Sequence, residues 1–223
     1  MKQSMRYGVV GLCLLLGCLP LTSCTGSGEP FEEASYTPDA PVQEVRLEVE
    51  DRELAVSLSE DEQVHIRYWE NSKEFYEISV SDEGVLTMTS ASDKAWTDYI
   101  GVKSSDEDRK ISLQVPDALL ETLTLSTTNE DISLPELAVT GSVSLSANGG
   151  DISFEALEVG SALTLSAKNG DISGAVMGSY DDFAIQTEIK KGESNLPDQK
   201  DGGEKTLHVS VNNGDADIAF VNE

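Results

Sequence analysis

Four aspartates recur at one position of a repeated sequence, and they are the residues whose spacing points most directly to chemistry. Asp131, Asp151 and Asp171 follow one another at intervals of 20 residues, and Asp215 occupies the same place in a more distant copy. If the copies stack as neighbouring strands, the first three carboxylates stand about 4.8 Å apart. Carboxylates this close repel one another, so each must accept hydrogen bonds from the backbone N–H groups of its own turn, or a cation must lie between them.

Calcium is the cation that such a column would select outside a cell, because it takes several oxygen ligands in irregular geometry. Against calcium, the repeat lacks the Gly-Gly-x-Gly-x-Asp spacing of calcium-binding β-rolls. It also offers one carboxylate per copy without a second acidic ligand at a fixed offset. We therefore expect turn capping and no cofactor, with calcium as the alternative.

Residues that would support catalysis are scarce. A lyase that cleaves polysaccharides needs a base beside an acidic, metal-binding cleft. No arginine follows Arg109, and the lysines of the repeats lie mostly in or beside expected turns. His65 and His208 each lie between apolar neighbours at outward strand positions, without an evident partner. With Cys24 as the one cysteine of the mature chain, we expect no nucleophilic catalysis and no enzyme.

The aspartates belong to a sequence that recurs five times in the C-terminal half of the chain. The three most similar copies begin at Leu123, Val143 and Leu163, and they alternate apolar with hydroxylic residues. This alternation is typical of a strand with one solvent-facing side. The fourth copy is looser, and the fifth, from Leu207, restores Asn-Gly-Asp. The turn positions of the five copies are Glu130, Gly150, Gly170, Gly192 and Gly214.

The repeat predicts an all-β fold, namely a parallel β-helix or β-solenoid with coils of about 20–22 residues. Glycine at the turn can adopt positive φ, and the flanking Asn and Asp can bond their own backbone, so Asn-Gly-Asp is typical of a corner. A two-residue hairpin also fits Asn-Gly, which leaves a meander as the alternative. Identical copies in register favour stacked coils.

The first 23 residues are typical of a lipoprotein signal peptide. A basic start is followed by a short apolar run and then by Leu-Thr-Ser before Cys24, and the run is short for a membrane span. Cys24 would become the lipidated first residue of a chain anchored outside the cell membrane or on the outer membrane. An ordinary cleaved signal peptide is the alternative. Residues 24–41, rich in Gly, Pro, Ser and Glu, predict a flexible tether.

Residues 42–223 are expected to form a single β-solenoid domain. Residues 42–116 would supply irregular N-terminal coils or a small capping sheet, and residues 117–223 the regular repeats. Trp69 and Trp96 lie in the irregular part, where the end of a solenoid needs an apolar plug; stacking on carbohydrate is the alternative role. The last coil shows no evident cap, and acidic residues around its edge would discourage end-to-end stacking.

The surface chemistry limits the class of partner. The chain has 41 acidic against 15 basic residues and a formal net charge of −26, which repels nucleic acid and anionic lipid head groups. Hydroxyl groups would form rows on one flat outer face, where a glycan or a protein could bind, although Ser and Thr also suit any exposed strand. The rows consist of Thr124, Ser126, Ser144, Ser146, Thr164 and Ser166.

The strand pattern as a whole resembles a bacterial family catalogued as putative adhesins with repeated β-strands. This is a domain of unknown function, distantly similar to autotransporter-type adhesin head domains. The resemblance runs from about Val42 to the C-terminus and rests on the strands before Leu58, on Leu-Thr-Met after Gly84 and on the recurring Gly-Asp-Ile-Ser. It implies a β-helical fold, a surface location and no catalytic residues. Two corners depart from the pattern, with Glu130 in place of Gly and Glu193-Ser in place of Asp-Ile.

These observations predict a non-catalytic lipoprotein of the bacterial cell surface. It would act as an adhesin or envelope binding module that presents a solenoid face to a glycan or protein. The alternative is a lipoprotein that senses envelope stress by binding a neighbouring membrane protein or cell-wall fragment. A β-helical enzyme acting on polysaccharide is the third reading.

Overall fold

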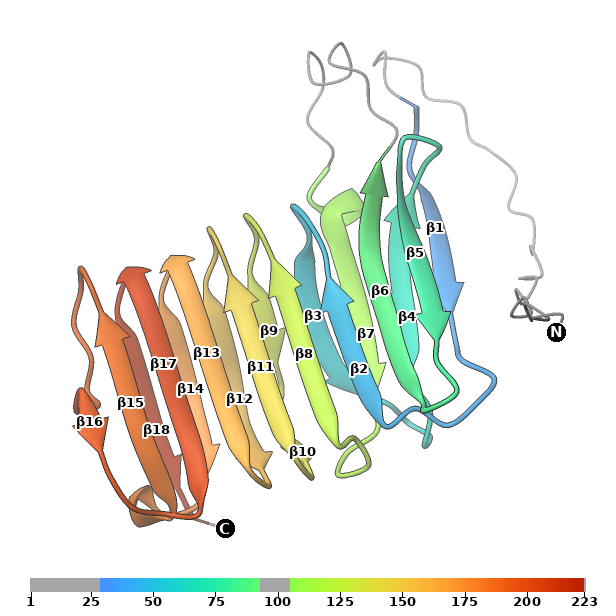
Figure 1. Ribbon diagram of the computed structural model, residues 1–223. Coiled ribbons are helices and arrows are strands. Elements are labelled where there is room, and N and C mark those ends of the chain that lie inside the picture. Colours follow the sequence, from blue (N-terminus) through green and yellow to red (C-terminus); the bar gives the residue numbers. More distant parts are fainter. Residues whose placement is uncertain (1–28, 93–104, 223) are drawn as a thin grey trace, which may run out of the picture.

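The computed structural model describes residues 29–92 and 105–222, and it is built almost entirely of β-strands (Figure 1). Two short 3-10 helices, η2 (Glu107–Arg109) and η3 (Tyr180–Asp182), interrupt the strands. Within the described ranges, no helix is long and apolar enough to cross a membrane. Cys24 and Trp96 lie outside the described residues.

The strands form two sheets that face each other, which we call sheet A and sheet B. Sheet A has the spatial order β1 (Glu32–Tyr36), β4 (His65–Glu70), β7 (Lys110–Val115), β3 (Glu53–Leu58), β9 (Ile132–Leu134), β12 (Ile152–Val159), β14 (Ile172–Met177) and β18 (Ala216–Val221), with β10 (Leu137–Val139) also paired to β12. Sheet B has the order β16 (Gln199–Lys200), β15 (Phe183–Ile189), β17 (Lys205–Asn213), β13 (Ala162–Asn169), β11 (Ser142–Ala147), β8 (Thr122–Thr127), β2 (Glu44–Glu48), β6 (Val85–Ser92) and β5 (Glu74–Val80).

Each regular coil contributes strands to both sheets: the coil that begins with β8 adds β9 and β10 to sheet A, and the coil that begins with β11 adds β12. β11 pairs in parallel with both β8 and β13, and Ser144 lies between Thr124 and Thr164, one repeat before and one repeat after it. The copies therefore stack with a register of one repeat and do not form hairpins. The expected all-β fold is confirmed as two parallel-rich sheets with a solenoid-like winding.

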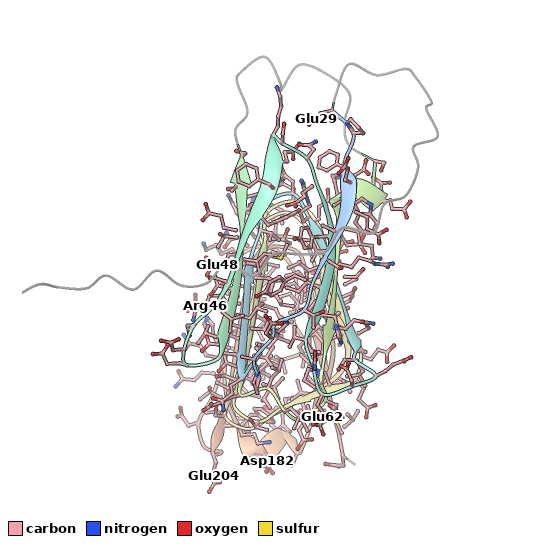
Figure 2. The ribbon with its side chains drawn as sticks, turned by 90° about the vertical axis from the view of Figure 1, so that its right-hand side faces the viewer. Glu29, Arg46, Glu48, Glu62, Asp182 and Glu204 are labelled. Atoms are coloured by element: carbon pink, nitrogen blue, oxygen red, sulfur yellow. The ribbon has the colours of Figure 1, made fainter. Side chains whose placement is uncertain are left out.

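The core lies between the two sheets, because successive side chains of a strand point to opposite faces. Leu123 and Leu125 of β8 are fully buried, and Leu163 and Leu165 of β13 stack in the same two rows. Burying one such leucine contributes about 1.5–3 kcal/mol. Figure 2, which looks along the stack, shows side chains filling this space, while Arg46 and Glu48 lie on the outer side of β2.

The spatial order of the coils differs from the chain order at the C-terminal end. β17 pairs with β13 on one side and with β15 on the other, so the fifth copy is inserted between the third and the fourth. The expectation that Asp215 belongs to a more distant copy is therefore wrong, because its copy is the direct neighbour of the third. A reason lies in the turns: the fifth copy keeps Asn-Gly-Asp, which suits a corner with neighbours on both sides, whereas the fourth copy keeps only its glycine.

The fourth copy is therefore the cap that the sequence did not reveal. Asn195 lies beside β18 and takes the place of a further strand: its Oδ1 accepts the N–H of Ile218 at 3.0 Å, and its Nδ2 donates to the Ile218 carbonyl at 2.9 Å. Leu196 next to it is 8% exposed. Because an open sheet edge invites pairing with other chains, these contacts protect the end of the stack.

At the N-terminal end, too, the spatial order of the coils differs from their order in the chain. The coil formed by β2 and β3 lies between β6–β7 and β8–β9, although β6 and β7 follow it in the chain. The segment 42–58 is thus a regular internal coil, not an irregular one. Antiparallel pairing of β1 with β4 and of β5 with β6 then closes the end. β1 lies within the expected tether, so that prediction is wrong for Glu32–Tyr36.

A buried arginine joins β5, at this N-terminal end, to the coil formed by β2 and β3. Arg52 has a side chain 6% exposed; its Nε donates to the hydroxyl of Tyr76 at 2.6 Å and its Nη2 to Glu74 at 2.9 Å. Burial raises the pKa of the Tyr76 hydroxyl. The Tyr76 ring meets that of Tyr68 edge-on at 5.2 Å between centroids. These contacts hold β5 against the corner between β2 and β3.

Candidate functional site

The four aspartates form a column at the corner where sheet B strands end and sheet A strands begin. The N–H of Asp151 donates to Oδ1 of Asp131, that of Asp171 to Asp151, and that of Asp215 to Asp171, each at 2.8 Å. Glu193 continues the series by donating to Asp215 at 2.8 Å. Each carboxylate thus accepts its hydrogen bond from the next coil, and not from its own turn as expected. Asp215 directly follows Asp171 because the fifth copy is inserted.

A shallow hollow of about 370 Å³ lies beside this column, and we call it the C-terminal hollow. Its other lining residues include Ser153, Ser173 and Asp217 of sheet A. No group of three or more His, Cys, Asp or Glu residues in the described part of the chain is arranged to hold a metal ion. The hydrogen bonds from each coil to the next give the column the geometry of a ladder.

The turn glycines form a second column next to the aspartates. A Cβ on Gly150 would collide with the carbonyl oxygen of Glu130, one on Gly170 with that of Gly150, and one on Gly214 with that of Gly170. Gly192 is packed against Gly214 in the same way. The expected positive φ is found at Gly192 (134°) and Gly214 (145°) but not at Gly170. Close stacking of the corners, and not backbone conformation, requires glycine at that position.

The two corners that depart from the repeat lie at the two ends of these columns. Glu130 begins the glycine column, and its carboxylate pairs with Arg109 at the end of η2, just before β7. Glu193 lies at the other end, in the capping copy; its N–H donates to Asp215 and its carbonyl accepts the N–H of Ala216. The departures therefore mark where the glycine and aspartate columns stop.

The hydroxyl rows predicted on one face lie on the outer side of sheet B. Thr124, Ser144 and Thr164 are aligned, and His208 of β17 continues their row. A second row aligns Ser126, Ser146, Ser166 and Ser210. All of these side chains are partly exposed.

The outer side of sheet A carries a further polar row that the sequence reasoning missed. Ser133, Ser153 and Ser173 are aligned across β9, β12 and β14, and Asp217 of β18 extends the row. The serine of each Asp-Ile-Ser could have predicted this row. The preceding isoleucine is buried, so the alternation of a strand places the serine on the outer face.

A larger hollow of about 520 Å³ lies on the same sheet near the N-terminal end, and we call it the N-terminal hollow. It spans the outer faces of β1, β4, β7 and β3. Sequence analysis did not find it, because it depends on the antiparallel strands β1 and β4 and on the exchanged position of β3. Its lining residues are Ser35, Thr37, Ser57, His65, Ile66, Arg67, Ser112 and Gln114.

His65, expected to be unpartnered, has two partners at the rim of the N-terminal hollow. Its Nδ1 lies 2.9 Å from Oγ1 of Thr37, and its Nε2 lies 2.9 Å from Oδ1 of Asp61. The hydrogen bond from His65, followed by that from the N–H of Gln63, lowers the pKa of the Asp61 carboxyl. The contacts tie the segment after β1 to the segment before β4.

The match to known families decides the identity of the domain. Residues 42–215 match the family described as Toastrack DUF4097. The chain belongs to the Toastrack family. Its solenoid-like, all-β fold agrees with the resemblance inferred from the repeats. No curated protein sequence matches this Toastrack chain.

A solved structure shares this fold at low sequence identity. A putative cell adhesion protein from Clostridium sporogenes superposes with a TM-score of 0.58 at 11% identity, covering 86% of this chain and 100% of that protein. A putative adhesin from Bacteroides fragilis gives a TM-score of 0.32 at 11% identity over 87% and 98% of the two chains. A putative adhesin from Parabacteroides distasonis gives 0.33 at 13% identity over 86% and 98%. The Clostridium protein alone supports an argument, and that argument concerns the fold.

Proposed function

We propose that this Toastrack protein is a non-catalytic binding module of the bacterial cell surface, lipid-anchored through Cys24, that presents an outer sheet face to a glycan or a protein. The observation that carries the proposal is the parallel register, which places like polar side chains in rows on both outer faces. Short hydroxylic side chains on a rigid sheet lose little conformational entropy on binding.

The described contacts favour binding over catalysis. Thr37, His65 and Asp61 stand in the order hydroxyl, imidazole and carboxylate that hydrolases use. A threonine hydroxyl, however, serves as a nucleophile when the amino terminus of its own residue is the base. Thr37 is an internal residue. We therefore assign these three residues to holding β1 and β4 together.

Two binding measurements with the purified protein test the proposal. Fluorescently labelled protein is applied to a glycan array, and in parallel a photo-cross-linker is placed at Ser146 or Ser153 of protein made in the producing bacterium. We expect saturable retention by a glycan or one cross-linked surface protein, with no released product. If the protein is neither retained by a glycan nor cross-linked to a surface protein, or if sugar fragments are released from the retained glycan, a non-catalytic binding role is contradicted.

A further inference from the structure

The N-terminal hollow brings two aligned rows of polar side chains together. Residue register across β4, β7 and β3 places His65 opposite Gln114, and Gln114 opposite Ser57. The neighbouring row places Ser35 and Ser112 on either side of Arg67. Every one of these residues lines the hollow, which is within the size range of small-molecule sites, about 300–1,000 Å³.

Four of the lining side chains are free to bind a ligand. Ser35, Ser57, Ser112 and Gln114 make no side-chain hydrogen bond to another described residue, and each can both donate and accept. His65 is held by Thr37 and Asp61, so the rim beside them is fixed. The hollow therefore presents, in aligned rows, side-chain hydrogen-bond donors and acceptors that no other described residue pairs.

The charge of the hollow sets it apart from the rest of the protein. Among the described residues no carboxylate lines it, although the chain carries 41 acidic residues, whereas five aspartates line the C-terminal hollow. Its one permanent cation, Arg67, lies 3.6 Å from Glu33. The hollow is thus close to neutral within a strongly acidic molecule, which disfavours an anionic polymer by long-range repulsion.

An aromatic side chain lies beside these polar rows. Trp69 follows Arg67 at alternate positions of β4, on the same face, and the Arg67 guanidinium lies 5.7 Å from the centre of its ring. Trp69 is partly exposed. An apolar ring next to several hydroxyl and amide groups suits a ligand with one apolar face and many hydroxyl groups.

We propose that the N-terminal hollow binds a neutral oligosaccharide. Sugar hydroxyl groups would bond the side chains of Ser57, Ser112 and Gln114, and a sugar ring would lie against the side of Trp69. This inference rests on the proposed binding function and deepens it, because it selects the ligand class and the face. It places the glycan on sheet A and not on the hydroxyl rows of sheet B.

Isothermal titration calorimetry with the purified protein tests this assignment. The probes are maltohexaose, cellohexaose, mannohexaose and the hexamer of N-acetylglucosamine, with hexagalacturonate as the anionic comparison. The test variant is the double substitution Ser112→Ala with Gln114→Ala. Matched controls are Ser153→Ala, on the same face outside the hollow, and Thr164→Ala, in the rows of sheet B. Thermal denaturation of each variant confirms that it folds.

We expect at least one neutral hexamer to bind more tightly than hexagalacturonate. The double variant should then weaken binding by about fivefold or more, because it removes two hydrogen-bonding side chains, while both controls stay within about twofold. Binding lost in Thr164→Ala but kept in the double variant overturns the site and leaves the proposed function standing. If no neutral hexamer binds, the ligand class is wrong, and cross-linking to a surface protein shows separately whether the binding function holds.

Discussion

The backbone N–H of Asp171 donates a 2.8 Å hydrogen bond to Oδ1 of Asp151 in the preceding coil. The same contact joins Asp151 to Asp131 and Asp215 to Asp171. A carboxylate held this way serves the neighbouring corner, so the column links the coils from Asp131 to Glu193. This relationship gives the aspartate of each repeat a hydrogen-bond partner in the next coil, which accounts for its recurrence once per repeat.

We predict that Asp151→Ala destabilises the protein, because it removes the acceptor of the Asp171 N–H. The loss should be about 1–2 kcal/mol in the free energy of unfolding, and Asp151→Asn, which keeps an acceptor oxygen, should lose less. Urea denaturation measures both, with Ser153→Ala as the matched control on the adjoining strand.

Calcium binding is the alternative role of the aspartate column, and a calcium titration distinguishes it from the hydrogen-bonded ladder. If the column is a hydrogen-bonded ladder, millimolar calcium leaves the melting temperature of the purified protein unchanged. A rise of several degrees that Asp151→Asn abolishes would show that the carboxylates bind the cation.

We predict that Gly170→Ala is destabilising, even though Gly170 does not have positive φ. Its added Cβ would collide with the carbonyl oxygen of Gly150, so the two corners must move apart. Overpacking of this kind costs about 1–3 kcal/mol. Thr164→Ser on the outer face of sheet B should change the stability far less. Equal unfolding free energies for the two variants would refute the role of close stacking.

We predict that cysteines placed at Ser166 and Ser210 form a disulfide, because these residues are paired neighbours on β13 and β17. Parallel neighbours lie about 4.8 Å apart, within the Cα separation of about 4.4–6.8 Å that a disulfide allows. The native cysteines are first replaced by serine, and electrophoresis without reductant detects the bond.

The comparison pair for this experiment is Ser166 with Glu188. Glu188 lies on β15 and pairs with Ser210, so it is one strand further from Ser166. A solenoid wound in chain order would instead place Glu188 beside Ser166. Efficient oxidation of the Ser166 and Glu188 pair, with none for Ser166 and Ser210, contradicts the inserted fifth copy.

We predict a pH-dependent contribution from Asp61. Its pKa is lowered in the folded protein from an ordinary value of 3.8, mainly by the hydrogen bond from His65. Its contribution to stability is therefore present above that ordinary pKa and is lost as the pH falls through the lower, folded value. Asp61→Asn should lower the melting temperature at pH 7, and the difference from wild type should shrink in strong acid. A difference independent of pH would exclude this ionic contribution.

We predict that Cys24 determines membrane association. Wild-type protein should enter the detergent phase when cells are extracted and phase-separated, since an acyl chain gains about 0.8 kcal/mol for each buried methylene. Cys24→Ala should leave the protein out of that phase. Wild-type protein found only in the aqueous phase would rule out the anchor.

Local patterns in the sequence were enough to predict the strands, the stacking and the aspartate column. Alternation in Leu163-Thr-Leu-Ser depends on adjacent residues, and the spacing of Asp131, Asp151 and Asp171 directly encodes their alignment. Which coil donates the N–H group to each aspartate carboxylate could not be predicted in this way, because that depends on the distance between successive corners. The need for glycine at position 170 was likewise attributed to backbone conformation, whereas it arises from the close approach of the Gly150 carbonyl.

The order of the coils and the N-terminal hollow depended on distant parts of the chain. By strand pattern alone, either β15 or β17 could lie beside β13, and only the missing Asp-Ile after Gly192 hinted that the fourth copy ends the stack. His65 finds its partners, Thr37 and Asp61, in segments outside the strands. Periodicity carries no information about such contacts.

The most direct test of the account is a backbone amide NMR titration of the wild-type protein with the tightest-binding neutral hexasaccharide. Binding in the N-terminal hollow predicts that chemical shifts change first at Ser57, His65, Ser112 and Gln114 of sheet A, with saturation at the affinity found by calorimetry. Shifts confined to Thr124, Ser144 and Thr164 of sheet B, or no saturable shift anywhere, would contradict it.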